Sequence, residues 1–399
     1  MAEETGKLGL TPVEVNRRAA ERVASGHPWI FASDVVARNG AASGAVVRVV
    51  DPARKPLGMA HHSSASQIAL RMLGARVEPV DGAFFQRRLE RALAYRQSVV
   101  SGTTAYRLVH GEADLLPALV IDRYADCFVV QTLDQGMDAA KAEIVEALVA
   151  MFSPRGIVER NDAPVRTREQ LPLVASTLAG EPPEEIEFEM NGLRLGARLL
   201  AGQKTAVYLD QRENYLAARR FAQAAASGPA LDCFSYTGGF ALHLSAACPS
   251  VEAIDTSTEA VEMARRNAAW NGLTNIELRQ ADVFELLPQY AAARRRFGLV
   301  VLDPPAFAKS RSHLPSAARG YKEINLRALR LLDRGGVLVT CSCSHHMSEA
   351  QLLEIVASAA LDAGRQLRVL DRRTQALDHP ILLTVPETHY LKCLILQCL

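Results

Sequence analysis

Apolar and polar residues alternate along the first part of the chain, and turn residues interrupt the pattern often. The stretch GAVVRVVD at 44–51 predicts a strand, and LGMAHHSSASQIALRML at 57–73 predicts a second one. Glycines and prolines such as Gly40 and Pro52 separate the runs. Short strands with frequent turns are typical of a small β-barrel, which we expect over residues 1–75.

A helical period follows over residues 82–100, where apolar residues recur near one face and arginines lie elsewhere. We then expect a helix over 137–152 and four strands, with the sequences YRLVHG, ALVIDRY, CFVVQTL and GIVER. The stretch STLAGEPPEE at 176–185 is rich in small, acidic and proline residues, which predicts a linker. Residues 76–185 are therefore expected to form a small α+β domain.

The remaining residues, 186–399, show a different order of elements. Asn191-Gly192 predicts a hairpin, because this pair accepts the positive φ angles of a type I′ turn. From about residue 228, strands and helices alternate: the strands are ALDCFSY, VEAIDTS, NIELRQ, FGLVVLD and GGVLVTCSC, and the helices are ALHLSAA, STEAVEMARRNAAWNG and EINLRALRLLDR. Such alternation predicts an α/β domain with a mainly parallel sheet, which binds ligands beyond the carboxyl ends of its strands.

A glycine pair follows the first of these strands, in the segment DCFSYTGGF that begins at Asp232. The segment is neither G-x-G-x-x-G nor G-x-x-x-x-G-K-[ST], so it predicts neither a dinucleotide site nor a triphosphate site. Paired glycines do let the backbone approach a ligand closely. We assign five residues of this turn to a cofactor site: Phe234, Tyr236, Thr237, Gly238 and Gly239.

Aspartates stand at four successive strand ends: Asp232, Asp255, Asp282 and Asp303. S-adenosylmethionine (SAM) has a ribose, an adenine and a cationic amino acid but no phosphate, so it needs hydrogen-bond acceptors. Asp255 is placed to accept from the ribose, Asp282 from the adenine amino group, and Asp232 from the ammonium. Each one alone can instead be a helix cap. Four in register after a Gly-Gly turn favour SAM.

The segment Asp303-Pro304-Pro305-Ala306-Phe307 follows the fourth strand. The two prolines restrict the backbone and so fix where the next residues project. Asp303 can hydrogen-bond the edge of a nucleobase and Phe307 can stack on one, although Phe307 can equally be an ordinary packed aromatic. We assign Asp303 to catalysis, and we assign four residues to the substrate: Pro304, Pro305, Phe307 and Lys309.

A cysteine at such a site has one particular use. C5 of cytosine or uracil is a poor nucleophile, but a thiolate that adds to C6 makes C5 able to attack the methyl group of SAM. A base then removes the C5 proton, and the thiol is eliminated. Cys343, which stands between Ser342 and Ser344 at a strand end, fits this role. Four other cysteines fit better as small buried residues: Cys233, Cys341, Cys393 and Cys398.

Composition narrows the classes of protein that remain. The seven cysteines are odd in number and include no C-x-x-C pair, so neither a disulfide framework nor a zinc site is expected. No run of about 18 apolar residues and no signal peptide is present, so no membrane span is expected, and the absence of a disulfide framework predicts a reduced, cytoplasmic location. Residues 1–76 carry ten Lys and Arg against six Asp and Glu, a weak indication of contact with phosphates.

Ten stretches make the sequence resemble one known family. They are HPWIFASDV, SASQIALR, FFQRRL, YRLVHGEADLLPALVIDRY, KTAVYLDQREN, CFSYTGGFAL, DTSTEAVEMARRN, DPPAFAKS, RGYKEIN and TCSCSHHMS, in this order from residue 27 to residue 348. The family is the bacterial large-subunit ribosomal RNA methyltransferase I family, which makes 5-methylcytosine in 23S rRNA. The resemblance implies an RNA-binding PUA domain at 1–75, a central α+β domain at 76–185 and a Rossmann-like class I SAM-dependent methyltransferase domain at 186–399.

The resemblance also implies roles for particular residues. Cys343 is the nucleophile, and Gln211, in KTAVYLDQREN, belongs to the cofactor site. Large-subunit rRNA is the partner, and a homodimer is reasonable. RNA contacts are implied near five residues of the first domain: Arg17, Arg18, Arg22, His27 and Trp29. Pro28-Trp29 can equally be part of the core of the barrel.

The sequence departs from the family pattern at two places. Ala206-Val207 stands where the family usually has a Gly-Tyr pair, and His345-His346 follows Cys343-Ser344 where glycine and an apolar residue are frequent. The wider RNA cytosine-5 class has a second cysteine after the Asp-x-Pro motif, where this chain has Ala306. The family resembled here also lacks it, so the base that removes the C5 proton stays open.

Two alternatives compete with cytosine methylation. The same fold can methylate a base nitrogen such as guanine N7 or N2, which is already nucleophilic and needs no thiol. Alternatively, the protein is an RNA-binding assembly factor without catalytic activity, which the acidic strand ends disfavour. The role of Cys343 distinguishes the first alternative, and SAM binding distinguishes the second.

Overall fold

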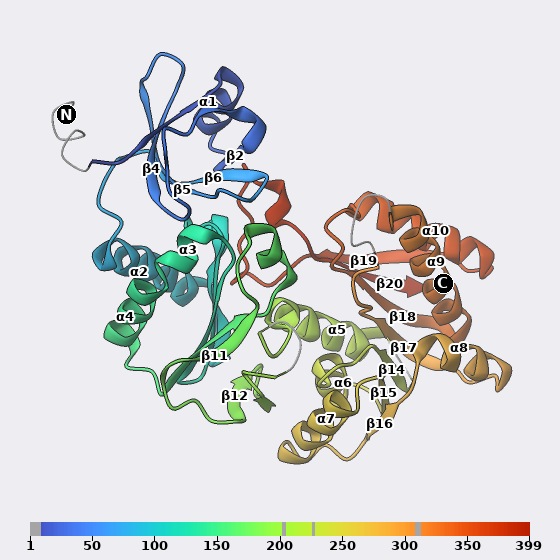
Figure 1. The fold of residues 1–399 in the computed structure, drawn as a ribbon. Helices are drawn as coiled ribbons and strands as arrows, with labels where there is room; N and C mark the ends of the chain where they lie inside the picture. The colour runs from blue at the N-terminus through green and yellow to red at the C-terminus, as the bar shows by residue number, and fades with distance from the viewer. Residues whose placement is uncertain (1–8, 202–204, 226–227, 308–312) are drawn as a thin grey trace. The chain divides into compact units, whose positions relative to one another are not determined.

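The first sheet has six strands in the order β2-β6-β5-β4-β1-β3, in a computed structural model that describes residues 9–201, 205–225, 228–307 and 313–399 (Figure 1). Its elements are β1 (Pro12–Val15), α1 (Arg17–Ala24), β2 (Trp29–Phe31), η2 (Ala32–Asp34), β3 (Val35–Ala37), β4 (Val46–Val50), β5 (Pro56–His62) and β6 (Ile68–Gly74). The single strand expected over 57–73 is wrong. The chain turns there, because Ser63 Oγ accepts a hydrogen bond from Ser66 N at 3.0 Å, and β5 and β6 pair as a hairpin.

The second sheet has five strands in the order β11-β10-β9-β8-β7. Its elements are α2 (Gly82–Val99), β7 (Ala105–His110), η3 (Gly111–Asp114), β8 (Leu119–Tyr124), β9 (Cys127–Thr132), α3 (Gln135–Ala139), α4 (Lys141–Phe152), β10 (Gly156–Asn161), η4 (Pro164–Glu169) and β11 (Val174–Gly180). The linker expected over 176–185 is wrong as far as Gly180, because β11 pairs antiparallel with β10 as an edge strand. The helix expected over 137–152 is divided at Ala140.

Contacts group the chain into two units. The first contains the residues up to Phe188 together with Arg198–Ala206 and Leu377–Thr388, and the second contains Glu189–Ala197, Val207–Ala376 and His389–Leu399. The division into three domains at residues 75 and 185 stays a prediction.

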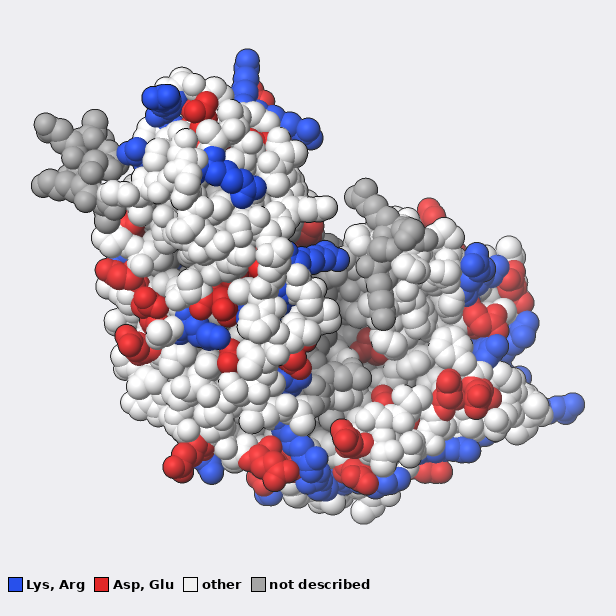
Figure 2. Space-filling model, in the orientation of Figure 1, with Lys and Arg blue, Asp and Glu red and all other residues white. Residues whose placement is uncertain are grey.

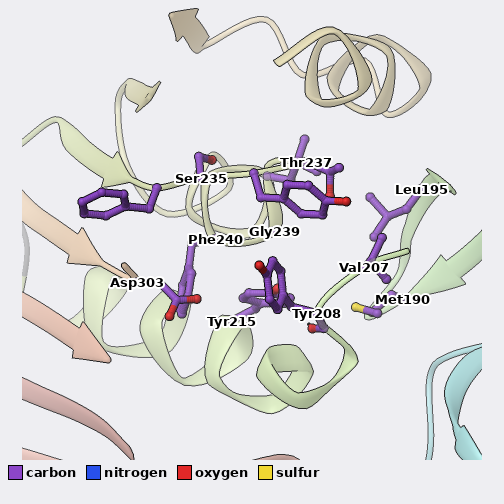
Figure 3. Close-up of a pocket in the computed structure, with 13 residues that line it drawn as sticks. Met190, Leu195, Val207, Tyr208, Tyr215, Ser235, Thr237, Gly239, Phe240 and Asp303 are labelled. Atoms are coloured by element: carbon purple, nitrogen blue, oxygen red, sulfur yellow. Dashed lines mark hydrogen bonds between the residues drawn. The ribbon is translucent and has the colours of Figure 1, made fainter. Parts of the chain in front are cut away.

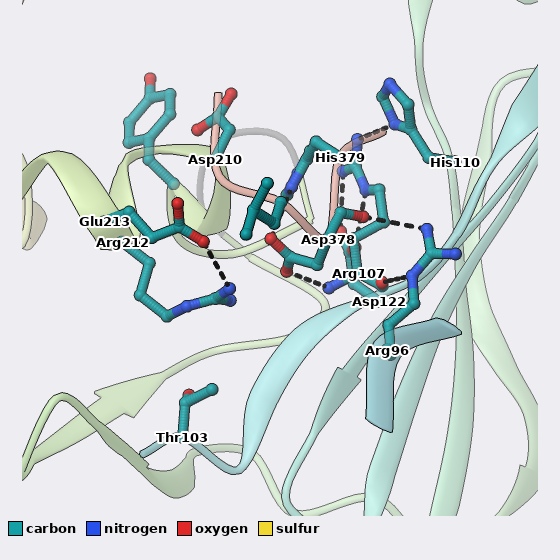
Figure 4. A network of polar contacts seen from close by, with 12 residues as sticks. Arg96, Thr103, Arg107, His110, Asp122, Asp210, Arg212, Glu213, Asp378 and His379 are labelled. Atoms are coloured by element: carbon teal, nitrogen blue, oxygen red, sulfur yellow. Dashed lines mark hydrogen bonds and ion pairs between the residues drawn. The ribbon is translucent and has the colours of Figure 1, made fainter. Parts of the chain in front are cut away.

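A buried polar network fixes the segment Leu377–Thr388 to the rest of the first unit (Figure 4). Arg96, which is almost fully buried, pairs with Asp114 and donates to the carbonyl oxygen of Asp378 at 2.9 Å. The Asp378 carboxylate accepts from the backbone N–H of Arg107 at 2.9 Å. Burial together with Arg107 holds the pKa of His110 well below its ordinary value, so this ring stays neutral inside the network.

Seven strands form the main sheet of the second unit, in the order β16-β15-β14-β17-β18-β20-β19. They are β14 (Ala230–Cys233), β15 (Val251–Asp255), β16 (Ile276–Gln280), β17 (Phe297–Leu302), β18 (Leu332–Ser342), β19 (Leu367–Arg373) and β20 (Lys392–Cys398). The first five are parallel, and β20 is antiparallel to both of its neighbours. The predicted α/β class is therefore confirmed.

Helices cover both faces of this sheet, with α5, α6 and α7 on one face and α8, α9 and α10 on the other (Figure 1). Their bounds are α5 (Arg212–Ala225), α6 (Gly239–Leu244), α7 (Thr258–Trp270), α8 (Val283–Ala292), α9 (Leu314–Leu331) and α10 (Glu349–Asp362), and the short helices η5 (Leu209–Gln211) and η7 (Pro386–Thr388) complete the chain. Every residue of β17 is buried, as expected for a strand covered on both faces. The order in which the strands are connected reverses between the neighbouring parallel strands β14 and β17, and such a switch point leaves a crevice at the carboxyl ends of the two strands.

The hairpin expected at Asn191-Gly192 is confirmed. It joins β12 (Ile186–Met190) to β13 (Leu193–Ala197), with φ angles of 55° at Asn191 and 80° at Gly192. Among the helices that the structure describes, none combines the length and the apolar character needed to cross a bilayer.

Candidate cofactor and catalytic site

A cleft of about 490 Å³ opens at the carboxyl ends of β14 and β17 (Figure 3). It is lined by Met190, Leu195, Val207, Tyr208, Tyr215, Phe234, Ser235, Tyr236, Thr237, Gly239, Phe240, Leu242 and Asp303. Five of the predicted site residues line it: Phe234, Tyr236, Thr237, Gly239 and Asp303.

The turn after β14 is held in an unusual backbone conformation. Phe234 and Tyr236 have φ angles of 63° and 50°, values that side chains other than glycine adopt rarely and at a cost of about 1–3 kcal/mol each. Asp255 stabilises the turn, because its carboxylate accepts from Tyr236 N at 2.8 Å and from Ser257 N at 2.9 Å. A Cβ on Gly239 would lie 2.4 Å from the Tyr215 ring, so only glycine fits there.

Asp232 lies fully buried beneath this turn. One carboxylate oxygen accepts from Ser235 Oγ at 2.6 Å and from Ala241 N at 2.9 Å. The other oxygen, Oδ1, is buried without a hydrogen-bond partner among the described residues. Burial raises the pKa of this carboxyl to about 7, although the bonds from Ser235 and Ala241 act in the opposite direction. An unpartnered buried acceptor of this kind suits a cationic ligand group.

Aromatic side chains form much of the cleft. Tyr208 meets Tyr236 edge-on with ring centroids 5.3 Å apart, and Tyr215 meets Phe240 at 4.8 Å. Burial, reinforced by Asp303, raises the pKa of Tyr208, so its phenol stays protonated. Sequence reasoning did not assign Tyr208 or Tyr215, although KTAVYLDQREN contains Tyr208.

Asp303 follows β17 directly and faces the cleft (Figure 3). Its Oδ2 accepts a hydrogen bond from Gln211 Nε2 at 2.9 Å, and Gln211 Oε1 accepts in turn from Asn214 Nδ2 at 2.7 Å. Gln211 is buried and does not line the cleft itself. It therefore orients Asp303 from behind.

Other predicted residues lie outside the lining of the cleft. Asp282 is exposed and caps α8 by accepting from Phe284 N at 2.7 Å. Pro304 is buried and Pro305 is exposed. The Phe307 ring packs on Tyr321 with centroids 4.7 Å apart. Lys309 lies outside the described residues, and the adenine contact of Asp282 stays a prediction, as do the substrate contacts of these residues.

Cys343 is half-buried, whereas the other six cysteines are buried. The buried state predicted for Cys233, Cys341, Cys393 and Cys398 is thus confirmed. Cys343 follows the last residue of β18, and both serines beside it are fully buried. Ser342 Oγ donates to Tyr321 Oη at 2.9 Å, and Tyr321 Oη lies 3.2 Å from Ser344 Oγ. His345 and His346 are exposed.

The cysteine and the cleft are electrostatically connected. Burial is the largest cause of the raised pKa of Tyr208, and negative charge on Asp303, Tyr236 or Cys343 raises it further. Tyr208 lines the cleft, so the thiol lies within electrostatic reach of the cleft wall.

The residues at the cleft fit SAM better than they fit a phosphate-bearing cofactor. Among the described residues, no Lys or Arg lines the cleft, and its wall combines aromatic rings with acceptors. The unpartnered Asp232 oxygen lies beneath the same turn. In the described ranges, no group of three or more His, Cys, Asp or Glu side chains is arranged to hold a metal ion.

Some of the residues implied for RNA contact in the first unit are committed to internal bonds. Arg22 pairs with Asp34 at 2.7 Å, and Trp29 Nε1 donates to Glu112 Oε1 at 2.8 Å. Arg17 and Arg18 are exposed. Figure 2 shows exposed Lys and Arg side chains over the N-terminal sheet, at the top of the view. RNA contact by the five residues Arg17, Arg18, Arg22, His27 and Trp29 stays a prediction.

Comparison with protein families defines the class. Residues 164–383 match the model of the S-adenosylmethionine-dependent methyltransferases, and residues 13–74 match that of the PUA-like domains. The protein is thus a SAM-dependent methyltransferase with a PUA-like N-terminal domain.

Relatives with similar sequences identify one family within this class. The ribosomal RNA large subunit methyltransferase I of Klebsiella pneumoniae is 42% identical over 92% of this chain and 93% of its own length. That of Escherichia coli is 40% identical over 92% of this chain and 94% of its own. The chain belongs to the ribosomal RNA large subunit methyltransferase I family.

Solved structures agree on the fold. A methyltransferase in complex with SAH has a TM-score of 0.83 at 20% identity, with 97% of this chain and 100% of that one covered. A SAM-dependent methyltransferase from Streptococcus mutans has a TM-score of 0.81 at 20% identity, with the same coverage. Nearly the whole chain therefore shares its fold with these two solved structures.

The departure from the family pattern at Ala206 has a structural consequence. Ala206 adopts a φ of 134°, a region that glycine occupies readily and alanine does not. The strain falls on the segment that leads into Val207 and Tyr208, which line the cleft.

Replacing Asp255 with alanine is expected to weaken SAM binding by about 1–3 kcal/mol, the scale of a lost hydrogen bond to a charged acceptor. The variant removes the carboxylate that accepts a hydrogen bond from Tyr236 N, and with it the acceptor assigned to the ribose of SAM. Calorimetric titration with SAM measures the effect, and Glu259→Ala, an exposed carboxylate on α7, is the control. An unchanged affinity would remove Asp255 from the site.

Proposed function

We propose that this protein methylates C5 of a cytosine in 23S rRNA, with SAM as methyl donor and Cys343 as covalent nucleophile. The observation that carries the proposal is the position of Cys343. It is the one cysteine of the seven that is not buried, and it stands at the carboxyl end of β18 within electrostatic reach of Tyr208 in the cofactor cleft. The names of the relatives, which are large-subunit rRNA methyltransferases, support the choice of RNA.

The proposed reaction has three steps, which are addition of the thiolate, methyl transfer and elimination of the thiolate. The Cys343 thiolate adds to C6 of the cytosine, and the electron pair of the C5–C6 bond becomes available at C5. When bound, SAM supplies an electrophilic methyl group, and C5 takes it up as the bond between the methyl carbon and the sulfonium sulfur breaks and S-adenosylhomocysteine leaves. A base then removes the proton from C5, the electron pair of the C5–H bond restores the C5=C6 double bond, and the Cys343 sulfur leaves C6 as a thiolate.

The chain's own residues prepare these steps. Asp303, held by Gln211, presents a carboxylate where it can accept from the exocyclic amino group of the cytosine or receive the C5 proton. The aromatic rings of the cleft wall offer the bound donor a largely apolar surface. The PUA-like domain contributes RNA binding. A cytoplasmic location and a homodimer remain predictions that accompany this function.

The test is the identity of the methylated nucleoside. Purified protein is incubated with labelled SAM and unmodified large-subunit rRNA, and the digested RNA is analysed by mass spectrometry. We expect 5-methylcytosine. A methylated guanine would retain the fold and the cofactor but overturn the base and the thiol mechanism.

A further inference from the structure

Lys392 is a buried cation in the second unit. It is the first residue of β20, and its side chain is almost fully buried. In the part of the chain that the structure describes, no carboxylate forms an ion pair with it. A buried ammonium without a counter-ion costs several kcal/mol, so its presence calls for a compensating anion.

The amine is fixed beside the cysteine turn. Lys392 pairs with Ser342 across the β18–β20 ladder, and its Nζ donates to the carbonyl oxygen of Ser344 at 2.7 Å. A second bond goes to the carbonyl oxygen of Tyr390 at 2.8 Å. The first of these bonds joins β20 to the residue that follows Cys343. An ammonium has three donors, so one remains beyond these two carbonyls.

The electrostatics of the amine point to the same residue. Burial lowers the pKa of Lys392 to about 8, and a negative charge on Cys343 acts in the opposite direction. At neutral pH the amine is therefore still charged. The phenols that also interact with Cys343, Tyr208 and Tyr321, have pKa values raised chiefly by burial and stay neutral.

We propose that Lys392 is the positioning residue of the methylation reaction, with the Cys343 thiolate as the counter-ion of its buried ammonium. The bond to Ser344 holds the turn that presents Cys343, and the positive charge favours the thiolate over the thiol. This inference rests on the proposed function, because it gives Cys343 the role of nucleophile.

The rate at which iodoacetamide alkylates Cys343 in the folded protein tests the proposal. The other six cysteines are buried, and mass spectrometry of the Cys343 peptide identifies the modified residue. In Lys392→Met we expect alkylation at pH 7 to slow by roughly tenfold, since less of the thiol is ionised. Lys392→Arg, which keeps the charge, is expected to restore most of the rate. Lys322→Met, at a more exposed lysine on α9, is the control.

Thermal unfolding and SAM titration establish that each variant is folded. If Lys392→Met does not fold, Lys392→Gln replaces it, because glutamine keeps a donor for the carbonyls and lacks the charge. Equal alkylation rates in the parent and in the neutral variant would overturn the proposal. Alkylation needs no RNA, so this outcome is distinct from failure of the proposed function, which full methylation by Cys343→Ala would show.

Discussion

Replacing Cys343 with alanine is expected to reduce cytosine methylation by about 10⁴-fold or more, the scale at which loss of a covalent nucleophile removes the catalysed route. C5 of cytosine is too weak a nucleophile to take up the methyl group unless sulfur has first added at C6. SAM binding should be unchanged, because Cys343 does not line the cleft. Single-turnover methylation of rRNA and calorimetric titration with SAM measure the two quantities separately.

Cys248→Ala is the matched control for this substitution, because Cys248 is a buried cysteine outside the lining of the cleft. It should keep the activity of the parent. Full methylation by the Cys343 variant would contradict the covalent mechanism and favour methylation of a base nitrogen, which requires no thiol.

Asp303→Asn is expected to lower kcat/KM by roughly 100-fold, since the substitution removes both a charged hydrogen-bond acceptor and the carboxylate that can receive the C5 proton. The substitution keeps the size of the side chain and an amide oxygen that can accept the hydrogen bond from Gln211. Methylation kinetics on rRNA measure the loss. Asp333→Asn makes the same change at an exposed position near the amino end of β18 and is the control.

The affinity for SAM distinguishes the two roles that Asp303 can have. An affinity within about threefold of the parent, a small fraction of the catalytic effect, is expected if Asp303 acts on the nucleobase. A loss of affinity as large as the loss of kcat/KM would assign Asp303 to the cofactor instead, and its catalytic role would have to be given up.

Much of the fold could be predicted from local patterns. The alternation after residue 228 predicted the parallel strands, and Asn191-Gly192 predicted a hairpin, because each signal comes from neighbouring residues. Whether a segment becomes an edge strand depends on pairing with another part of the chain, which the segment's own sequence does not show. The prediction failed at such a segment. The small residues of 176–180 were part of a predicted linker, but β10 supplies a partner that makes them an edge strand.

The site was predicted in the same uneven way. The aspartates at strand ends and the glycine pair were evident from their spacing, and Asp303, Gly239 and the turn residues do meet in the cleft. Met190 and Leu195 reach it only through the packing of the β12–β13 hairpin. Lys392 is separated from Cys343 by 49 positions, the difference of their residue numbers, and the antiparallel register of β18 and β20 brings its amine to Ser344.

The most direct test of the central claim is to trap the covalent intermediate. RNA that contains 5-fluorocytidine at the target stalls the reaction after methyl transfer, because fluorine at C5 cannot leave as a proton does. With SAM present, we predict a complex that survives denaturation and a nucleotide adduct on the Cys343 peptide in mass spectrometry. The absence of any adduct in a preparation that methylates ordinary rRNA, or an adduct on another residue, would contradict the account.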